Sequence, residues 1–135
     1  MSDLVAFLTA RLDEDEAAAK VLGAVEGHWV VVIPEGSAEP FLASETRGRA
    51  YLALPEPMLD YLMHFARHDP ARVLREVEAK RAILGRHEPG GDPADYDYGD
   101  APCMEDERIW PCLTVRALAA VYSGHPDYDE AFSPA

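Results

Sequence analysis

The stretch HFARHDPARVLREVEAKRAIL, residues 64–84, decides how the rest of this chain is arranged. It contains Asp69 followed by Pro70, a pair typical of a helix start. The Asp carboxylate can accept free backbone N–H groups, and proline lacks the N–H that would otherwise go unpaired. We therefore predict a helix that begins at Asp69-Pro70 and ends near Arg86, about 25 Å long at roughly 1.5 Å per residue.

The apolar residues of this predicted helix recur at steps of three, four and seven, which places them on one side. They are Val73, Leu74, Val77 and Leu84. A helix with one apolar face packs against a core, so we expect the other elements to gather along this face.

A second helix is predicted immediately before it, over residues 58–67. This helix should end near His68, because Asp69 precedes a proline and is disfavoured in helical geometry. The two helices would then meet at a bend, with His68 and Asp69 at the corner.

The remaining chain supplies two more helices and three short strands. The strands are rich in β-branched and aromatic residues and are separated by turn residues, which indicates an antiparallel meander. The helices are marked by capping residues and apolar spacing. The predicted helices are 2–22, with Ser2 as the cap and Leu22 in the apolar stripe, and 111–124; the strands are 28–33, 41–43 and 49–54.

These elements predict an α+β fold with about four helices packed on a small antiparallel sheet. The 135 residues are most simply one domain, 1–135, whose core needs no disulfide or metal. Within it, residues 88–110 form an irregular acidic loop rich in Gly and Pro, and residues 126–135 form a tail.

The formal charge of −13 is concentrated in the last third of the chain. Residues 88–135 hold 11 acidic and 2 basic side chains. Direct binding to nucleic acid needs clustered Lys and Arg, so this balance argues against it. It leaves open a basic protein partner, mimicry of nucleic acid, and an acidic surface that serves only solubility.

We expect a cytoplasmic protein with no membrane association. The sequence contains no run of about 18 apolar residues, and its first residues lack the basic-then-apolar order of a secretory signal. Its two cysteines fit a reducing compartment, where a thiol or metal role is more common than a structural disulfide.

The two cysteines lie between two histidines in the order His87, Cys103, Cys112, His125. Thiolates and imidazoles are the ligands that zinc prefers, so this set is a candidate zinc site that would hold the acidic loop against the last helix. The spacing lacks the usual CxxC turn. Cys112 could instead be a small buried residue, or a thiol made more acidic by the helix N-terminus.

His64 and His68 form a second candidate metal pair, because residues four apart lie on one face of a helix. Such pairs are common, and both histidines could equally serve the helix C-terminus. Similarly, five aromatic residues in the acidic third could be a recognition surface or could anchor a polar segment to the core, namely Tyr96, Tyr98, Trp110, Tyr122 and Tyr128.

Three strings resemble a family of small uncharacterised proteins, a domain-of-unknown-function family of actinobacteria and their phages. They are FLTARLDEDE (7–16), HFARHDPARVLREVEAKRAIL (64–84) and PCLTVRALAAVYSGHPDYDEAF (111–132). The resemblance implies no activity, substrate or catalytic residue. It draws attention to candidate interaction residues, namely Arg67, Asp69, Arg72, Arg116, Asp127 and Tyr128.

Three hypotheses for the function follow. The first is a small acidic interaction or regulatory protein without catalytic activity, working with a protein partner or as a homodimer, because the sequence contains no complete catalytic set. The second is a zinc-binding protein with the His and Cys site. The third is an acidic mimic of nucleic acid.

Overall fold

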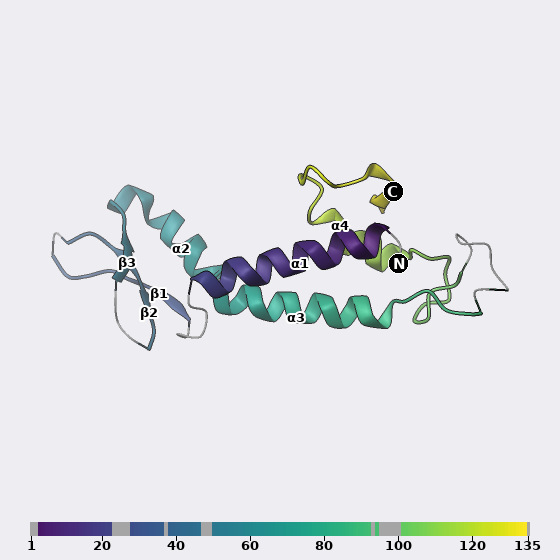
Figure 1. The fold of residues 1–135 in the computed structure, drawn as a ribbon. Helices are drawn as coiled ribbons and strands as arrows, with labels where there is room; N and C mark the ends of the chain where they lie inside the picture. The colour runs from purple at the N-terminus through teal and green to yellow at the C-terminus, as the bar shows by residue number, and fades with distance from the viewer. Residues whose placement is uncertain are drawn as a thin grey trace. The chain divides into compact units, whose positions relative to one another are not determined.

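The computed structural model describes residues 3–22, 28–36, 38–46, 50–92, 94 and 101–134. Within these ranges it confirms an α+β fold with four α-helices and a three-stranded antiparallel sheet (Figure 1). The elements are α1 (Asp3–Val21), β1 (Trp29–Val32), β2 (Phe41–Ser44), β3 (Ala50–Ala53), η2 (Glu56–Met58), α2 (Leu59–Arg67), α3 (Pro70–Arg86), α4 (Leu113–Ala120) and η3 (Glu130–Phe132).

The residues group into two compact units. The first unit comprises Met1–Glu14 and Val77–Ala135, and the second comprises Asp15–Glu76. Helices α1 and α3 each contribute residues to both. None of the described helices has the length and apolar character needed to cross a membrane.

Helix α3 begins where its cap predicts and ends at the predicted Arg86. It spans Pro70–Arg86, and the Oδ1 atom of Asp69 accepts a hydrogen bond of 2.8 Å from the backbone N–H of Arg72. Val77 is buried, and Leu84 packs partly buried against the core of the first unit. The capping prediction and the apolar face are therefore confirmed.

In the second unit, the predicted meander forms with strand order β1-β2-β3. Val31 pairs with Leu42, and Leu42 pairs with Leu52 on the other side. Helix α2 lies beside this sheet (Figure 1) and buries Leu62 completely. Arg49 and the Ser2 cap lie outside the described residues.

The core of the first unit is formed by α1, α4 and the segment before α4. Its buried residues are Leu4, Phe7, Leu8, Cys103, Trp110, Cys112, Val115 and Ala119. Leu22, which was predicted to continue the apolar stripe of α1, is instead 58% exposed. It follows Val21, the last residue of the helix, so it extends past the end of the packed face.

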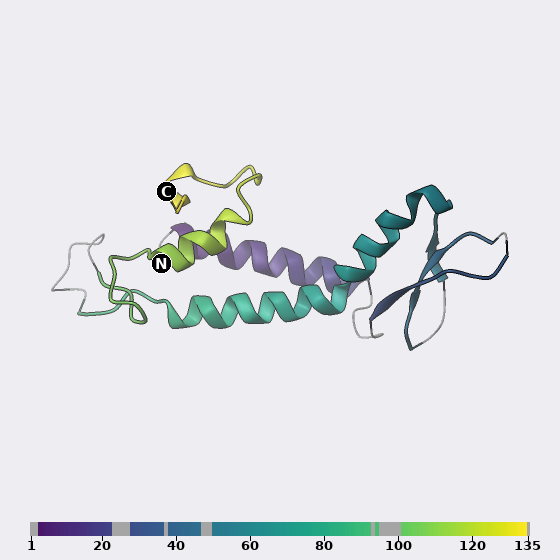
Figure 2. The ribbon, with the colours of Figure 1, turned by 180° about the vertical axis from the view of Figure 1, so that it is seen from behind.

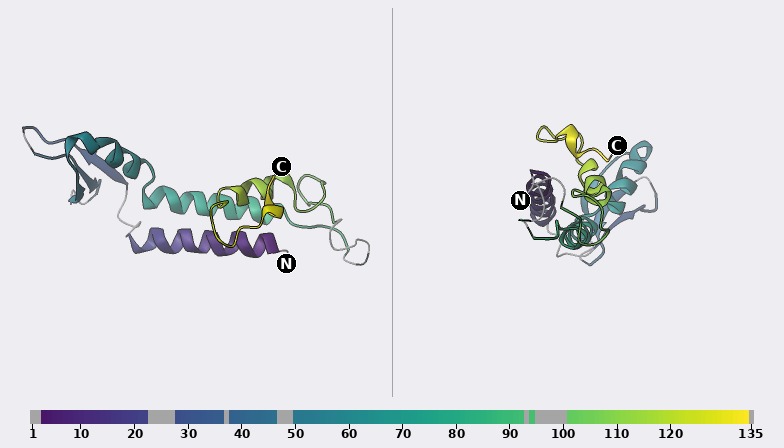
Figure 3. Two further views of the ribbon diagram at one scale, coloured as in Figure 1. Left: turned by 90° about the horizontal axis from the view of Figure 1, so that it is seen from above. Right: turned by 90° about the vertical axis from the view of Figure 1, so that its right-hand side faces the viewer.

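The C-terminal segment lies against the body of the first unit. Tyr128 and Phe132 both place their rings near Phe7, at centroid distances of 5.9 and 5.4 Å. The Arg116 guanidinium donates hydrogen bonds to the carbonyls of Ala131 and Ser133. In Figures 2 and 3 this segment, in yellow, turns back along α4.

The segment before α4 is more ordered than an irregular loop. The backbone N–H of Gly90 donates to the Pro102 carbonyl at 2.7 Å, and that of Met104 donates to the Glu88 carbonyl at 2.8 Å. Bridges join Pro89 to Cys103 and Pro102 to Ile109. The predicted irregularity of 88–110 is not confirmed where the segment is described, and residues 93 and 95–100 lie outside that part.

The last helix is shorter than predicted. It spans Leu113–Ala120, because Cys112 has an extended backbone with φ of −70° and ψ of 166°. Residues 121–124 continue the chain as turns. The prediction of a helix over 111–124 was therefore correct in place but wrong at both ends.

Candidate metal centre

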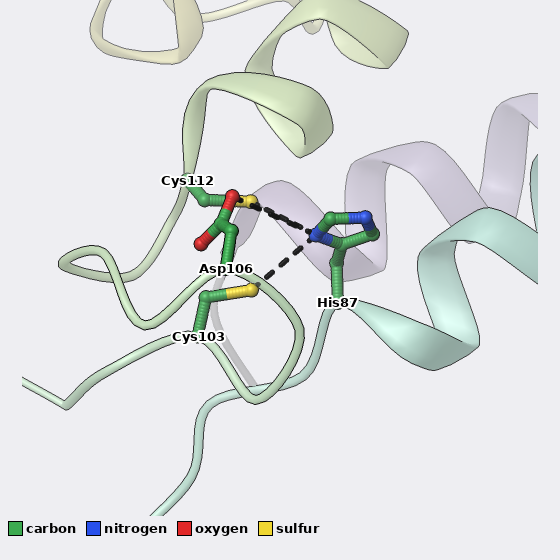
Figure 4. A group of neighbouring side chains, drawn as sticks. All are labelled: His87, Cys103, Asp106 and Cys112. Atoms are coloured by element: carbon green, nitrogen blue, oxygen red, sulfur yellow. Dashed lines mark hydrogen bonds and ion pairs between the residues drawn. The ribbon is translucent and has the colours of Figure 1, made fainter.

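Four potential metal ligands converge in the first unit. They are His87, Cys103, Asp106 and Cys112, and one ligand atom from each lies within 4.8 Å of the corresponding atom in every other residue. Figure 4 shows the two sulfur atoms directed toward the same nitrogen of His87, with the Asp106 carboxylate beside them. No other group of three or more such ligands occurs among the described residues.

Local backbone structure positions each of the four. His87 follows the last residue of α3, and its N–H continues the helical pattern by donating to the Ile83 carbonyl. Cys103 begins a tight turn, in which its N–H donates to the Arg108 carbonyl at 2.6 Å. Cys112 is the residue before α4.

Asp106 lies within the turn that starts at Cys103. One of its carboxylate oxygens accepts a hydrogen bond of 3.2 Å from the N–H of Arg108. The next residue, Glu107, has a φ of 57°, and this left-handed conformation, uncommon for a residue with a side chain, reverses the chain direction. The turn therefore points both the Asp106 carboxylate and the Cys103 thiol toward His87.

The distances fit a shared ion. The Nδ1 atom of His87 lies 3.3 Å from the Cys103 sulfur, 3.4 Å from the Cys112 sulfur and 3.9 Å from the Oδ2 atom of Asp106. Ligand atoms that surround one tetrahedral zinc ion at about 2.0–2.3 Å lie about 3.3–3.8 Å from one another. The two sulfur–nitrogen distances lie within this range, the third distance lies just above it, and the remaining pairs are within 4.8 Å, so the four side chains would close around a tetrahedral ion.

The sulfur atoms lie deeper than the other two ligands. Cys103 and Cys112 are 1% and 2% exposed, and both thiols are free. The His87 and Asp106 side chains remain partly accessible at 13% and 28%. An ion would therefore enter past His87 and Asp106.

Burial opposes ionisation of Asp106, but hydrogen bonds from the Arg108 N–H and from the two cysteine thiols outweigh it. The pKa of the Asp106 carboxyl is consequently lower than its usual value, with the nearby His87 contributing to the fall. This carboxyl is therefore a carboxylate at neutral pH, which is the form that binds a metal.

Burial raises the pKa of the Cys112 thiol, and the neighbouring Cys103 sulfur raises it further. The backbone N–H groups at the start of α4 act in the opposite direction but do not outweigh these effects. The alternative that the helix makes this thiol more acidic was therefore wrong. Without a cation, Cys112 is a protonated thiol at neutral pH.

His125 does not join this group, although the sequence pattern placed it there. Its Nδ1 atom lies 2.8 Å from the Nη1 atom of Arg11 and accepts a hydrogen bond from the Asp127 N–H. Its ring also packs near Phe7. The tail folds back on α1, which carries His125 away from the two cysteines.

Asp106 is the fourth member of the group, and the His and Cys pattern of the sequence did not indicate it. It is one of 11 acidic residues in the last third of the chain, which hid it. A usable signal was present, because Cys103 and Asp106 are three residues apart. This Cys-x-x-Asp spacing matches the tight CxxC turn of many zinc sites, with a carboxylate as the second ligand.

His64 and His68 do lie together on one face, with ring centroids 4.6 Å apart. Both are exposed, and no third ligand joins them among the described residues. They lie at the end of α2, where His64 lines a shallow open pocket with Met63, Ala66 and Arg67. Metal binding at this pair stays a prediction.

Most of the predicted interaction residues have contacts within the chain. Arg72 binds Glu76 and the Arg67 carbonyl, and Arg116 binds the carbonyls of Pro111, Ala131 and Ser133. Asp127 approaches Arg11 at 3.6 Å, and Tyr128 contacts Phe7. Tyr122 and Tyr128 pack around Phe7, and Trp110 is buried, as expected of anchors.

The comparisons with known proteins identify a family but no activity. No curated protein and no solved structure matches the chain. One family model matches, described as a family of unknown function (DUF6221), and its match covers residues 1–134. The chain therefore belongs to this family of unknown function, as the match over nearly its whole length shows.

Proposed function

We propose that this protein binds one zinc ion through His87, Cys103, Asp106 and Cys112, and that the ion has a structural role. The observation that carries the proposal is the convergence of four ligand atoms from three separate segments within 4.8 Å. The likeness to known proteins offers no activity, so the proposal rests on this geometry.

The hydrogen-bonding capacity and the charge of these four side chains are better satisfied around a cation than without one. A neutral imidazole nitrogen has one lone pair, so Nδ1 of His87 can accept a hydrogen from only one of the two thiols that approach it. The Asp106 carboxylate adds a negative charge to the same place. A divalent cation would use both sulfurs, the imidazole and the carboxylate together.

The ligand types favour zinc over harder ions. Mg²⁺ and Ca²⁺ prefer six or more oxygen ligands, whereas this site offers two sulfurs, one nitrogen and one carboxylate. Four protein ligands complete a tetrahedral zinc site and leave no open position for a substrate. This supports a structural role over a catalytic one.

The centre would add a further link between segments that backbone hydrogen bonds already join. His87 follows the last residue of α3, Cys103 and Asp106 lie in one turn, and Cys112 precedes α4. The intervening chain is acidic and poor in large apolar residues. Metal binding would add stability to that supplied by the buried Trp110 and the two buried cysteines.

A structural centre suits a protein that works through its surface. We therefore retain the non-catalytic interaction or regulatory role as the wider proposal, with a basic protein partner or a second copy as the binding partner. The cytoplasm suits the site, because reduced thiols are needed as ligands. Mimicry of nucleic acid and an origin in actinobacteria or their phages remain predictions.

The test is metal analysis of protein purified without a histidine tag and supplied with zinc. We expect about one equivalent of zinc per chain. Cobalt(II) in its place should give an intense absorption from thiolate bonding. Less than about a tenth of an equivalent of any transition metal, together with no thiolate absorption, would refute the proposal.

Variants then identify the ligands. We expect Cys103→Ser, Cys112→Ser and His87→Ala to lose the metal. Asp106→Asn should weaken binding by more than the roughly tenfold to hundredfold loss that follows removal of an outer partner. Retention of full affinity in Asp106→Asn would show that a different group occupies the fourth position.

Three matched controls complete the experiment. Glu105→Gln removes a neighbouring charge that pairs with Arg86 at the surface. His125→Asn keeps a hydrogen-bond acceptor for Arg11 but removes the predicted fourth ligand. The double variant His64→Ala with His68→Ala removes the second candidate pair. All three should bind zinc as the wild type does, and loss of zinc in the third would shift the site to α2.

A further inference from the structure

The two cysteines of the centre are suited to a second reaction. They are the only cysteines in the sequence, and their sulfur atoms lie within 4.8 Å of each other. Both are in contact with the same His87 nitrogen, at 3.3 and 3.4 Å, and Figure 4 shows that the sulfurs face the same space. Their arrangement brings two thiols together where a disulfide could form.

We propose that Cys103 and Cys112 are a redox modification site, at which a hydroperoxide converts them into a disulfide within the chain. Only the consequence for the metal rests on the proposed function. A disulfide has no thiolate charge, so its formation would remove two of the four ligands and release the zinc ion.

The reaction balances with the hydroperoxide as the sole oxidant. One cysteine sulfur attacks a peroxide oxygen, so that an S–O bond forms and the O–O bond breaks. The departing oxygen takes up a proton, leaving a sulfenic acid. The second sulfur then attacks the first, so that the S–S bond forms and the S–O bond breaks, and the hydroxide leaves as water with the second thiol proton.

Burial directs this chemistry to the partner within the chain. The two cysteines are 1% and 2% exposed, so the thiol of another protein molecule cannot approach them closely. A small hydroperoxide could enter past His87 and Asp106, whose side chains are partly accessible. The sulfurs must still close to a bond of about 2.05 Å, which requires side-chain rotation.

The backbone holds the two residues in place while this occurs. Cys103 is fixed by hydrogen bonds with Arg108 and Glu107, and Trp110 donates its N–H to the Ala101 carbonyl. Cys112 is fixed at the start of α4, where the Arg116 N–H donates to its carbonyl. We expect dithiothreitol, a small dithiol, to reduce this disulfide again by thiol–disulfide exchange.

The experiment treats reduced protein with hydrogen peroxide in two forms, loaded with zinc and freed of metal by a chelator. We expect both thiols to disappear together and the intact mass to fall by two hydrogens. The loaded form should also release its full equivalent of zinc to a coloured chelator. Dithiothreitol should restore both thiols and zinc binding.

Peptide mapping is needed because peroxide also adds oxygen to methionine, and Met104 is 66% exposed beside Cys103. The expected product is one peptide pair joined through Cys103 and Cys112. Oxygen adducts on the separate cysteines, or disulfide-linked dimers, would overturn the proposal. The single variant Cys112→Ser should give only oxygen adducts at Cys103, and circular dichroism reports whether it is folded.

The two arms separate failure of the centre from failure of the redox site. If the reduced protein binds no metal but the metal-free arm still forms the disulfide, the proposed function fails and the redox site stands. If zinc binds but peroxide leaves both thiols intact or only oxygenates them, the metal centre stands and the redox site fails.

Discussion

Two aspartates with lowered pKa values lie in different regions of the molecule and have different partners. Asp69, at the corner between α2 and α3 in the second unit, accepts hydrogen bonds from the backbone N–H groups of Arg72 and Trp29. His28 approaches its Oδ2 atom at 3.2 Å. Asp106, in the first unit, accepts one backbone N–H and faces two thiols and an imidazole.

The pKa of each carboxyl falls for the same reason. Burial opposes ionisation in both, and hydrogen bonds to the charged form outweigh it. The two carboxyls differ in the chemical type of their hydrogen-bond partners. Asp69 has two backbone amides and one imidazole, that of His28, as partners, whereas Asp106 also faces two thiols that can lose a proton and bind a cation. Asp69 thus caps α3 and holds Trp29, and Asp106 lies in the group of potential metal ligands.

The largest expected difference between the two regions is their response to metal removal. With free zinc about a thousandfold above its dissociation constant, binding to the folded state adds about 4 kcal/mol to the free energy of unfolding. Treatment with a chelator should therefore lower the midpoint of thermal unfolding by about 14 °C, at roughly 2.1 cal/mol/K of unfolding entropy per residue. Calorimetry with and without chelator measures this shift.

The control for this measurement is Asp106→Asn, which should respond much less to the chelator than the wild type does. Asp69→Asn should respond as the wild type does, because its carboxylate has no part in the proposed centre. Equal chelator responses in wild type and Asp106→Asn would remove the distinction between the two aspartates.

The second effect concerns the corner itself. Asp69→Ala removes a helix cap, worth about 1 kcal/mol, and leaves the partly buried N–H of Trp29 without its acceptor. We expect the free energy of unfolding to fall by about 2 kcal/mol, measured by urea denaturation. Asp69→Asn keeps a capping oxygen and should lose less. Zinc content should be unchanged in both, and a loss of zinc would show that the corner supports the centre.

The smallest expected effect is a difference between the pH at which zinc is released and the pH at which the stabilising effect of Asp69 is lost. Because the pKa of Asp69 is lowered by folding, its contribution to stability is complete above the usual pKa of about 3.9 and is lost as pH falls through the lower, folded value. Zinc should leave earlier during acidification. Protons compete for its thiol ligands, and burial already raises the pKa of Cys112.

Acid titration followed by both circular dichroism and a zinc indicator would resolve these two steps. We expect zinc release at the higher pH and the loss of secondary structure at the lower pH. In Asp69→Asn the second step should be weakened while the first stays in place. Coincident steps in the wild type would contradict the assignment of separate roles.

Local sequence signals predicted the elements because those signals act over a few residues. The cap at Asp69 gave the correct start for α3, and short runs rich in β-branched and aromatic residues, separated by turn residues, located the meander. The last helix was predicted to begin too early. The residues around Cys112 are typical of a helix, but the backbone of Cys112 is extended. Nothing in the local sequence reports that conformation.

The candidate site was predicted only in part. His87, Cys103 and Cys112 were chosen for their ligand chemistry, which a sequence displays directly. The choice between Asp106 and His125 depended on where the tail folds, and the tail contacts Phe7 and Arg11 across more than a hundred residues. The chemical type of a ligand can be read from a single residue, whereas the meeting of several ligands depends on how distant segments fold.

The amino-acid sequence by itself therefore determined the start of α3, the strands, the acidic balance and the kinds of ligand available. Only the tertiary structure decided that His125 binds Arg11 and that Asp106 takes its place beside the two sulfurs. The physical reason is range. Capping and periodicity act between residues a few positions apart, whereas a four-ligand cluster depends on how distant segments pack.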